Sequence, residues 1–154
     1  MRFLLLIFLL LVSTSNLAAQ CDSYMIGFKG LGGVFDTKAF NEYAGRNVDC
    51  SILFEHQQIT EAAELMSRIN KPYELYGFSA GAASIIPFLN KVKRQPRYII
   101  TVGAISSTNV DFLRHEINFD NFFDDSGKHN KSPGIYVRNM PHNKIQQYVT
   151  DFFK

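Results

Sequence analysis

The residues from Gly77 to Gly81 form a G-x-S-x-G pattern, and they constrain the fold more than any other stretch of the chain. Residues 73–76 favour a short strand before the pattern, and the small residues from Ala82 onward favour the start of a helix after it. A serine on such a sharp turn has strained backbone dihedrals, and glycines two residues before and after it remove the clashes across the turn. We therefore expect the Ser79 hydroxyl at the top of a sheet, beside the free N–H groups of a helix start, as a nucleophile requires. A serine that merely caps the helix is the alternative.

The first 19 residues have the features of a secretory signal peptide. A positive start at Arg2 precedes an apolar run over residues 3–12, a polar step and the small residues Ala18 and Ala19. The apolar run is shorter than the roughly 20 residues that a membrane-spanning helix needs. The sequence therefore predicts cleavage after Ala19 and a secreted or periplasmic protein. An uncleaved N-terminal segment that anchors the protein to a membrane is one alternative, and a lipid-anchored Cys21 is another.

Residues 20–154 are predicted to form a single domain, because this length buries one core. Hydrophobic residues make up 46% of the chain and charged residues 19%, which is typical of a globular protein. The net charge of +2 gives no strong basic face, so nucleic acid is not an expected partner. Export would allow Cys21 and Cys50 to pair, although the sequence does not show whether they approach each other. The cysteines and histidines lack metal-ligand spacing, so no metal site is expected.

Segments with strand and helix signals alternate along the chain. The expected strands cover residues 24–28, 48–54, 73–76, 98–102 and 134–137, with residues 117–123 as either a strand or an irregular loop. The expected helices cover residues 37–44, 61–69 and 143–153, with a further helix after Ser79 that Pro87 should kink or split. Asp36 and Thr60 are the predicted N-caps, and Gly45 is the predicted end of the first helix. This alternation predicts an α/β three-layer sandwich with a mostly parallel sheet.

These features resemble the α/β-hydrolase superfamily in a minimal form. The resemblance rests on the Ser79 turn, on the glycine-rich loop at residues 29–33 after the first strand, and on His142 after the last strand. In that family the nucleophile, the acid and the histidine follow in the chain order Ser, Asp or Glu, His. Ser79, the acidic pair Asp124 and Asp125, and His142 follow this order. The chain is too short for the extra N-terminal strands and lid of larger members, which implies an open, shallow site.

The resemblance assigns a role to each of these residues. His142 would be the base that takes the Ser79 proton, since His56 comes too early in the chain order. The acid would be Asp124, with Asp125 and then Asp111 as alternatives. The N–H groups of Leu31 and Ala80 would form an oxyanion hole, although the loop that contains Leu31 also fits an ordinary β-α turn.

The resemblance implies an exported serine hydrolase that cleaves a carboxylic ester or thioester through an acyl-enzyme, without a cofactor. The expected partner is a small-molecule or lipid-like ester. A non-catalytic binding protein with a degraded site and an acyltransferase with the same triad are the alternatives. Phe119, Phe122 and Phe123 would line an acyl pocket or, as the favoured interpretation, belong to the core.

Overall fold

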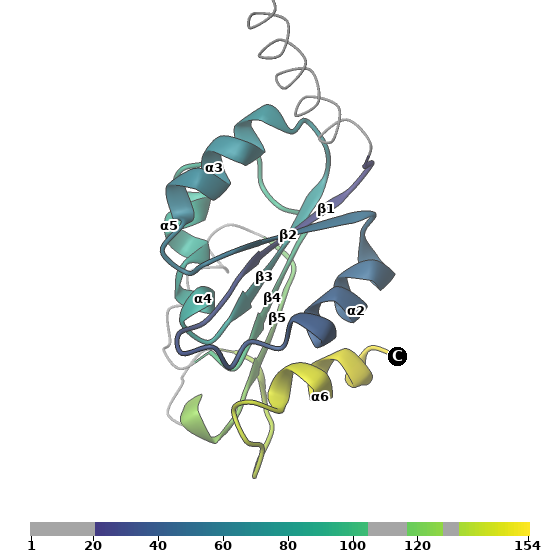
Figure 1. Cartoon of the computed structure of the whole chain (residues 1–154), viewed down its shortest axis with the longest axis vertical. Helices are drawn as coiled ribbons and strands as arrows, with labels where there is room; N and C mark the ends of the chain where they lie inside the picture. The colour runs from purple at the N-terminus through teal and green to yellow at the C-terminus, as the bar shows by residue number, and fades with distance from the viewer. Residues whose placement is uncertain (1–20, 105–116, 128–132) are drawn as a thin grey trace, which may run out of the picture.

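A computed structural model describes residues 21–104, 117–127 and 133–154 (Figure 1). In this part of the chain, six strands form one sheet in the order β2-β1-β3-β4-β5-β6, and every neighbouring pair is parallel. The strands are β1 (Tyr24–Phe28), β2 (Cys50–Phe54), β3 (Tyr73–Phe78), β4 (Tyr98–Val102), β5 (Phe119–Phe123) and β6 (Ile135–Tyr136). The segment 117–123, for which the sequence left two options, is therefore a strand over most of its length.

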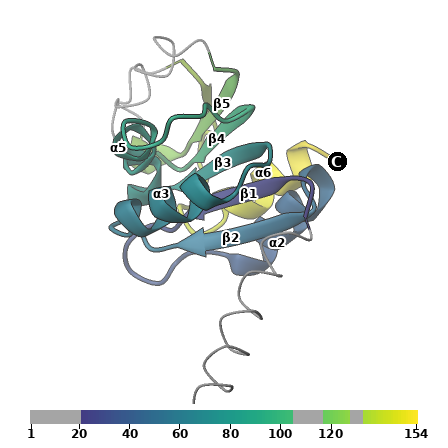
Figure 2. The same ribbon diagram turned by 90° about the horizontal axis from the view of Figure 1, so that it is seen from above.

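Helices cover both faces of the sheet. They are α2 (Thr37–Asn47), α3 (Ile59–Arg68), α4 (Ala80–Ala83), α5 (Ile85–Leu89) and α6 (Ile145–Phe152), with a short 3-10 helix η2 (Asp125–Gly127) after β5. Helices α2 and α6 lie on one face, and α3, α4 and α5 lie on the other, as Figures 1 and 2 both show. The chain therefore folds as the α/β three-layer sandwich that its alternating pattern predicts.

Each face of the sheet has its own hydrophobic core. Met25, Tyr76 and Ile100 pack with α2 and α6 on one face, while Ile26, Leu75 and Ile99 pack with α3 and α5 on the other. These are alternate residues of β1, β3 and β4, as expected for strands buried between two helical layers.

The three phenylalanines of β5 also belong to these cores. Phe122 and Phe123 are buried at 0% and 7% exposure, and Phe119 packs against the core on the α3 side. The favoured interpretation of these residues as core is therefore the one that the structure supports.

Helix boundaries differ from the prediction by up to three residues: α3 ends one residue early, α6 is two residues shorter at its start and one at its end, and the end of α2 and the start of α3 are also displaced. Asp36 is the N-cap of α2 as predicted, since its Oδ1 accepts a hydrogen bond from the Ala39 N–H at 2.9 Å. The helix nevertheless continues past Gly45 to Asn47, and its last turn gains a hydrogen bond from Arg46 Nη2 to the Thr150 carbonyl of α6 at 3.0 Å. Tertiary contacts thus outweigh the modest cost of a glycine inside a helix.

The predicted start of α3, at Glu61, is two residues later than the observed start. The helix begins at Ile59, so Thr60 lies inside it and Gln58 takes the N-cap position. The Gln58 side chain turns away from the helix and accepts a hydrogen bond from the Glu55 N–H at 2.9 Å. The helix after Ser79 is split as Pro87 predicts, with the break between α4 and α5 at Ser84.

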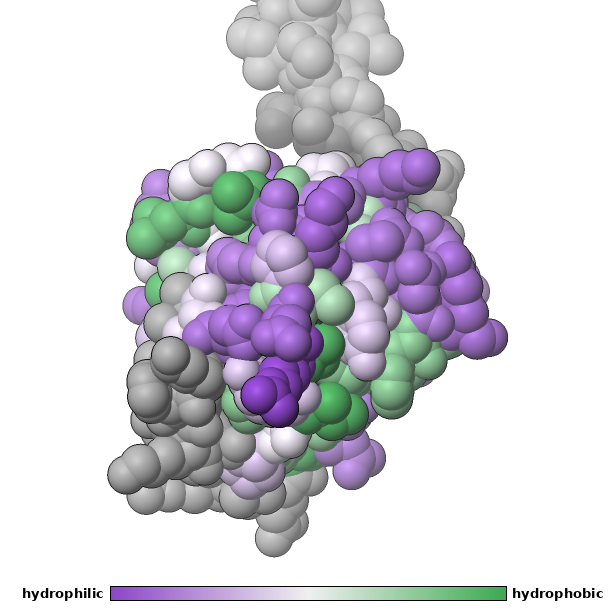
Figure 3. Space-filling model, turned by 90° about the horizontal axis from the view of Figure 1, so that it is seen from below, coloured by the Kyte–Doolittle hydropathy of each residue, from purple (hydrophilic) through white to green (hydrophobic). Residues whose placement is uncertain are grey.

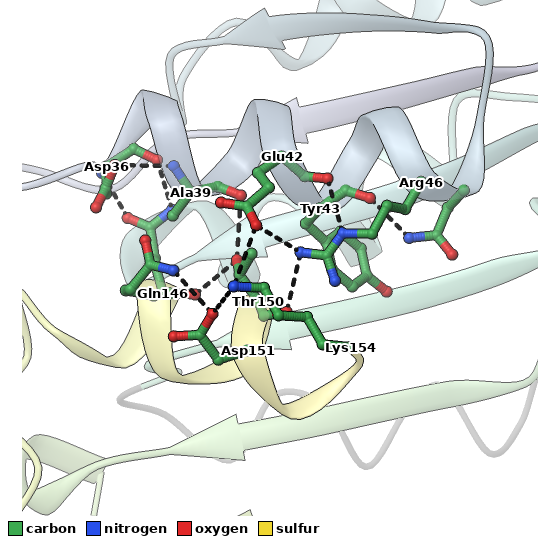
Figure 4. A network of polar contacts seen from close by, with 11 residues as sticks. Asp36, Ala39, Glu42, Tyr43, Arg46, Gln146, Thr150, Asp151 and Lys154 are labelled. Carbon is green, nitrogen blue, oxygen red and sulfur yellow. Dashed lines mark hydrogen bonds and ion pairs between the residues drawn. The ribbon is translucent and has the colours of Figure 1, made fainter.

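A polar network fixes α6 against α2 (Figure 4). Gln146 Oε1 accepts a hydrogen bond from the Asp36 N–H at 2.7 Å, and Thr150 Oγ1 donates to the Ala39 carbonyl at 3.1 Å. Both side chains are 1% exposed, so these bonds are shielded from water. The network therefore holds α6, which begins three residues after His142, in place.

The apolar face of α6 is only partly buried. Ile145 and Val149 lie in the core, whereas Tyr148 and Phe152 are 37% and 54% exposed. Phe152 still contacts the sheet, since its ring centroid lies 5.3 Å from that of Phe122.

A disulfide joins Cys21 and Cys50, whose Cα atoms are 5.9 Å apart. It connects the residues before β1 to the first residue of β2, across a sequence separation of 29. Because it restricts the unfolded chain, we expect the double variant Cys21→Ser, Cys50→Ser to lose about 3 to 4 kcal/mol of unfolding free energy. Urea unfolding of both proteins without reductant measures the difference. An unchanged transition midpoint would contradict a stabilising bond.

Candidate active site

The carboxyl ends of the parallel strands lie together at the lower end of the molecule in Figure 1. After β1 the chain turns to β2 on one side, and β3 then pairs with β1 on the other side. This reversal of strand order between β1 and β3 is the place where open α/β sheets bind ligands. Ser79 follows β3 and the loop from Lys29 follows β1, so both belong to this place.

Ser79 occupies a strained turn between β3 and α4. Its φ and ψ angles are 54° and −119°, in a region that non-glycine residues rarely adopt. Its N–H donates to the Val102 carbonyl at 2.9 Å, which holds the turn on the end of β4. Ala80 begins α4, so the first N–H groups of this helix have no partner within the helix. The structure therefore favours the strained turn over a simple helix cap, and Ser79 makes no side-chain cap bond.

The glycines around Ser79 are required by close packing. A Cβ on Gly77 would lie 2.7 Å from Ala82 Cα, and a Cβ on Gly81 would lie 2.7 Å from the Lys29 carbonyl oxygen and closer still to that of Phe28. A Cβ on Gly30 would lie 2.8 Å from Ser79 Cβ. Real Cβ atoms essentially never approach this closely, so all three positions admit only glycine without backbone movement.

Asp124 is the carboxylate in contact with His142. The distance between His142 Nδ1 and Asp124 Oδ2 is 2.6 Å, and Asp124 is fully buried. Asp124 Oδ1 accepts a second hydrogen bond, from the Ser126 N–H at 2.8 Å. Both oxygens are therefore satisfied inside the protein, and an imidazole that donates from Nδ1 leaves Nε2 free to accept a proton.

Asp125, the second residue of the acidic pair, has a different position. Its Oδ1 accepts hydrogen bonds from the Tyr136 hydroxyl and, at 3.4 Å, from the Asn139 N–H. It thus braces the loop that leads to His142 and has no contact with the imidazole among the described residues. Asp111, the third alternative, lies outside the described residues.

The imidazole of His142 lies against two residues that the sequence analysis did not single out. Its ring stacks on Phe78 with a centroid separation of 5.0 Å. Gly103, which has a φ of 65°, leaves room for it, because a Cβ there would lie 2.9 Å from His142 Cε1. Phe78 directly precedes Ser79. Gly103 directly follows Val102, whose carbonyl accepts the hydrogen bond from the Ser79 N–H. The sequence signal for this contact is the glycine directly after the β-branched strand 98–102, because a glycine there allows another group to approach the end of the strand closely.

These contacts bring Ser79 and His142 to the ends of the same two neighbouring strands. Within the described residues, no hydrogen bond joins Ser79 Oγ to His142. Such bonds are often long in ligand-free enzymes and shorten when substrate binds.

His56 does not share this arrangement. The His56 carbonyl accepts a hydrogen bond from Ser84 Oγ at 2.5 Å, and its buried Nδ1 has no hydrogen-bond partner in the described part of the chain. His56 therefore packs against the junction of α4 and α5, and it has no hydrogen bond to Asp124. His115 and His129 lie outside the described residues.

The loop after β1 also reaches the site. Gly30 packs against Ser79, and Leu31 next to it is 63% exposed. Lys29 forms an ion pair with Glu55 at 3.0 Å. Figure 3 views this end of the molecule, where hydrophobic patches lie beside hydrophilic residues. Leu31 is thus an exposed apolar residue directly after the glycine that packs on Ser79.

The described residues contain no group of three or more histidine, cysteine, aspartate or glutamate side chains placed to hold a metal ion. In the same residues, no helix has both the length and the apolar character needed to cross a bilayer.

Family models, curated proteins and solved structures were compared with this chain, and none of them matches. The assignment of a function therefore depends on the geometry of the site.

The contact between Gly103 and His142 leads to a prediction for the variant Gly103→Ala. The added methyl group would push the imidazole away, and misplacement by about 1 Å costs on the order of 10²-fold in rate. We expect kcat for hydrolysis of a p-nitrophenyl ester to fall by about 10- to 100-fold.

Gly45→Ala is the control for this experiment. It adds the same methyl group inside α2, where a Cβ would meet no atom within 4 Å. This variant should keep the kcat of the parent protein, and a folded Gly103→Ala protein with an unchanged kcat would contradict a specific role of Gly103 in seating His142.

Proposed function

We propose that this protein is a serine hydrolase that cleaves a carboxylic ester or thioester through an acyl-enzyme. The observation that carries the proposal is the hydrogen bond between buried Asp124 and His142, located at the ends of the two strands that hold the strained Ser79. The chain order Ser79, Asp124, His142 is that of the α/β-hydrolase superfamily, which the chain resembles.

Acylation begins with attack of Ser79 Oγ on the substrate carbonyl carbon. His142 Nε2 takes the hydroxyl proton as the new O–C bond forms, and Asp124 stabilises the resulting imidazolium through Nδ1. The tetrahedral intermediate then collapses, and the bond to the leaving alcohol or thiol breaks. His142 returns its proton to that leaving group, and Ser79 keeps the acyl group.

Deacylation repeats these steps with water. His142 Nε2 takes a proton from the water molecule as it attacks the acyl carbon, and then returns a proton to Ser79 Oγ as the carboxylic acid leaves. No cofactor takes part in this cycle.

The negative charge on the carbonyl oxygen needs hydrogen-bond donors. The Ala80 N–H lies at the start of α4, and the loop that contains Leu31 packs against Ser79 through Gly30. We assign the Ala80 and Leu31 N–H groups to this oxyanion hole, where one donor typically contributes on the order of 10²- to 10³-fold in rate.

Export of the protein belongs to the same proposal. The disulfide between Cys21 and Cys50 suits an oxidising compartment outside the cytosol. The signal-like features of residues 1–19 favour the same location, with cleavage after Ala19.

A fluorophosphonate probe tests the proposal, because it reacts with an activated serine. We expect the purified protein to be labelled at Ser79 and the variant Ser79→Ala to remain unlabelled. Ser107→Ala is a control that keeps the nucleophile and should be labelled like the parent protein.

Two outcomes would overturn the proposal or change it. A folded protein that is not labelled at all would indicate a non-catalytic binding protein. A labelled protein that forms new esters from alcohol acceptors faster than it forms the free acid would indicate an acyltransferase.

A further inference from the structure

A cavity of about 380 Å³ lies between α3 and the segment that follows α5. Tyr73, the first residue of β3, lines it, whereas Ser79 follows the last residue of the same strand. Six strand residues span about 20 Å, so this cavity is separate from the candidate active site. The end of α3 that lines the cavity lies in the upper part of Figure 1.

The inner wall of the cavity is apolar. It is formed mainly by Ala63, Met66, Ile69, Tyr73 and Val92. Its volume falls within the range of about 300 to 1,000 Å³ that is typical of small-molecule sites. Methionine adapts its shape to irregular ligands, so Met66 suits a flexible hydrocarbon chain.

The rim of the cavity is cationic. Lys91, Lys93 and Arg94 line it, and both lysines are exposed. Among the described residues, neither lysine forms an ion pair with a carboxylate. An anion at the rim would therefore meet positive charge that no described acidic side chain neutralises.

Arg94 is held in place before any ligand binds. Its Nη1 donates to the Lys71 carbonyl at 2.8 Å, and its Nη2 donates to the Ile69 carbonyl. Its guanidinium carbon lies 5.7 Å from the centre of the Tyr73 ring, and the Tyr73 hydroxyl donates to the Arg94 carbonyl at 2.5 Å. These bonds use two of the five N–H donors of the guanidinium. The others are available to a ligand at little further cost in side-chain entropy.

We propose that this cavity binds a small amphipathic anion, namely a carboxylate with an unbranched hydrocarbon chain. The chain would fill the apolar wall, and the carboxylate would meet Lys91, Lys93 and Arg94. A small polar anion would leave the apolar wall unfilled, and a neutral or cationic amphiphile would leave the rim without a partner. The proposal does not depend on hydrolysis at Ser79.

Calorimetric titration with sodium decanoate, below its critical micelle concentration, tests this site. We expect saturable binding of one decanoate per protein and about tenfold weaker binding to Lys93→Glu, because a charge-assisted hydrogen bond is lost and a repulsive charge is added. Ala63→Phe fills the cavity and should abolish the binding. Lys38→Glu makes the same change of charge on α2, on the other face of the sheet, and should leave the affinity unchanged.

Sensitivity to Lys93 also separates this cavity from the Ser79 site. Decanoate bound only beside Ser79 would have the same affinity for Lys93→Glu and for the parent protein, and that result would overturn the proposal. Equal affinity for decyltrimethylammonium would also overturn it. Binding to phosphatidylglycerol vesicles without binding of monomeric decanoate would identify the rim as a membrane-contact surface instead.

Discussion

Replacing Asp124 with asparagine is expected to lower kcat for ester hydrolysis by about 10⁴-fold. The asparagine oxygen can still accept the hydrogen bond from the Ser126 N–H, so its amide nitrogen would face His142 Nδ1. An amide group donates at that position, which forces Nδ1 to accept and places the imidazole proton on Nε2. His142 would then be unable to take a proton from Ser79. Steady-state hydrolysis of a p-nitrophenyl ester measures the loss.

Asp125→Asn is the matched control for this prediction, because it makes the same change at the next residue. Asp125 contacts Tyr136 and Asn139, so its substitution should change kcat by less than about tenfold. The rate of fluorophosphonate labelling should follow the same order, with Asp124→Asn slow and Asp125→Asn close to the parent protein. The assignment of Asp124 as the acid fails if Asp125→Asn shows the larger loss of kcat.

The Ser79 turn and every strand of the described sheet except β5 could be predicted because their signals are local. The β-branched run of residues 98–102 matches β4 residue for residue, and the glycines at 77 and 81 are needed for contacts with nearby segments. The spacing of strands and helices also predicted a parallel sheet between two helical layers. Such features depend on residues close together in sequence, which a single chain displays directly.

The sequence ranked Asp124 before Asp125 but could not exclude Asp125 as the residue that contacts His142. The two residues are adjacent on a loop, and their side chains point to different partners, one to His142 and the other to Tyr136. Which of them faces the imidazole depends on how the loop after β5 meets the loop after β6. The pairing of Cys21 with Cys50 was undecided for the same reason, since it depends on the register of β1 with β2.

The extra length of α2 depends on contacts with α6, which a local pattern does not show. Arg46 in the last turn of α2 and Gln146 near the start of α6 form hydrogen bonds that span more than 100 residues of sequence. Local propensity predicts a helix end at Gly45, and these long-range contacts outweigh that preference.

Among glycine-to-alanine substitutions at the described residues, Gly81→Ala is expected to destabilise the protein most. The new Cβ would overlap the Phe28 carbonyl at the end of β1, and it would lie 2.7 Å from the Lys29 carbonyl oxygen. Both neighbours are backbone atoms of the sheet and its first loop, so relief requires movement of α4 or β1. We expect a loss of about 4 kcal/mol of unfolding free energy, at the upper end of overpacking effects.

Gly45→Ala is the control that separates this clash from a general effect of alanine. Gly45 lies inside α2, and a Cβ there would meet no atom within 4 Å. Because alanine restricts the unfolded chain and favours the helix, this variant should gain about 0.5 to 1 kcal/mol. Urea unfolding monitored by circular dichroism measures both changes. A Gly81→Ala midpoint equal to that of the parent protein would mean that α4 does not pack on the end of β1. That result would also contradict the close approach of these two elements that positions Ser79.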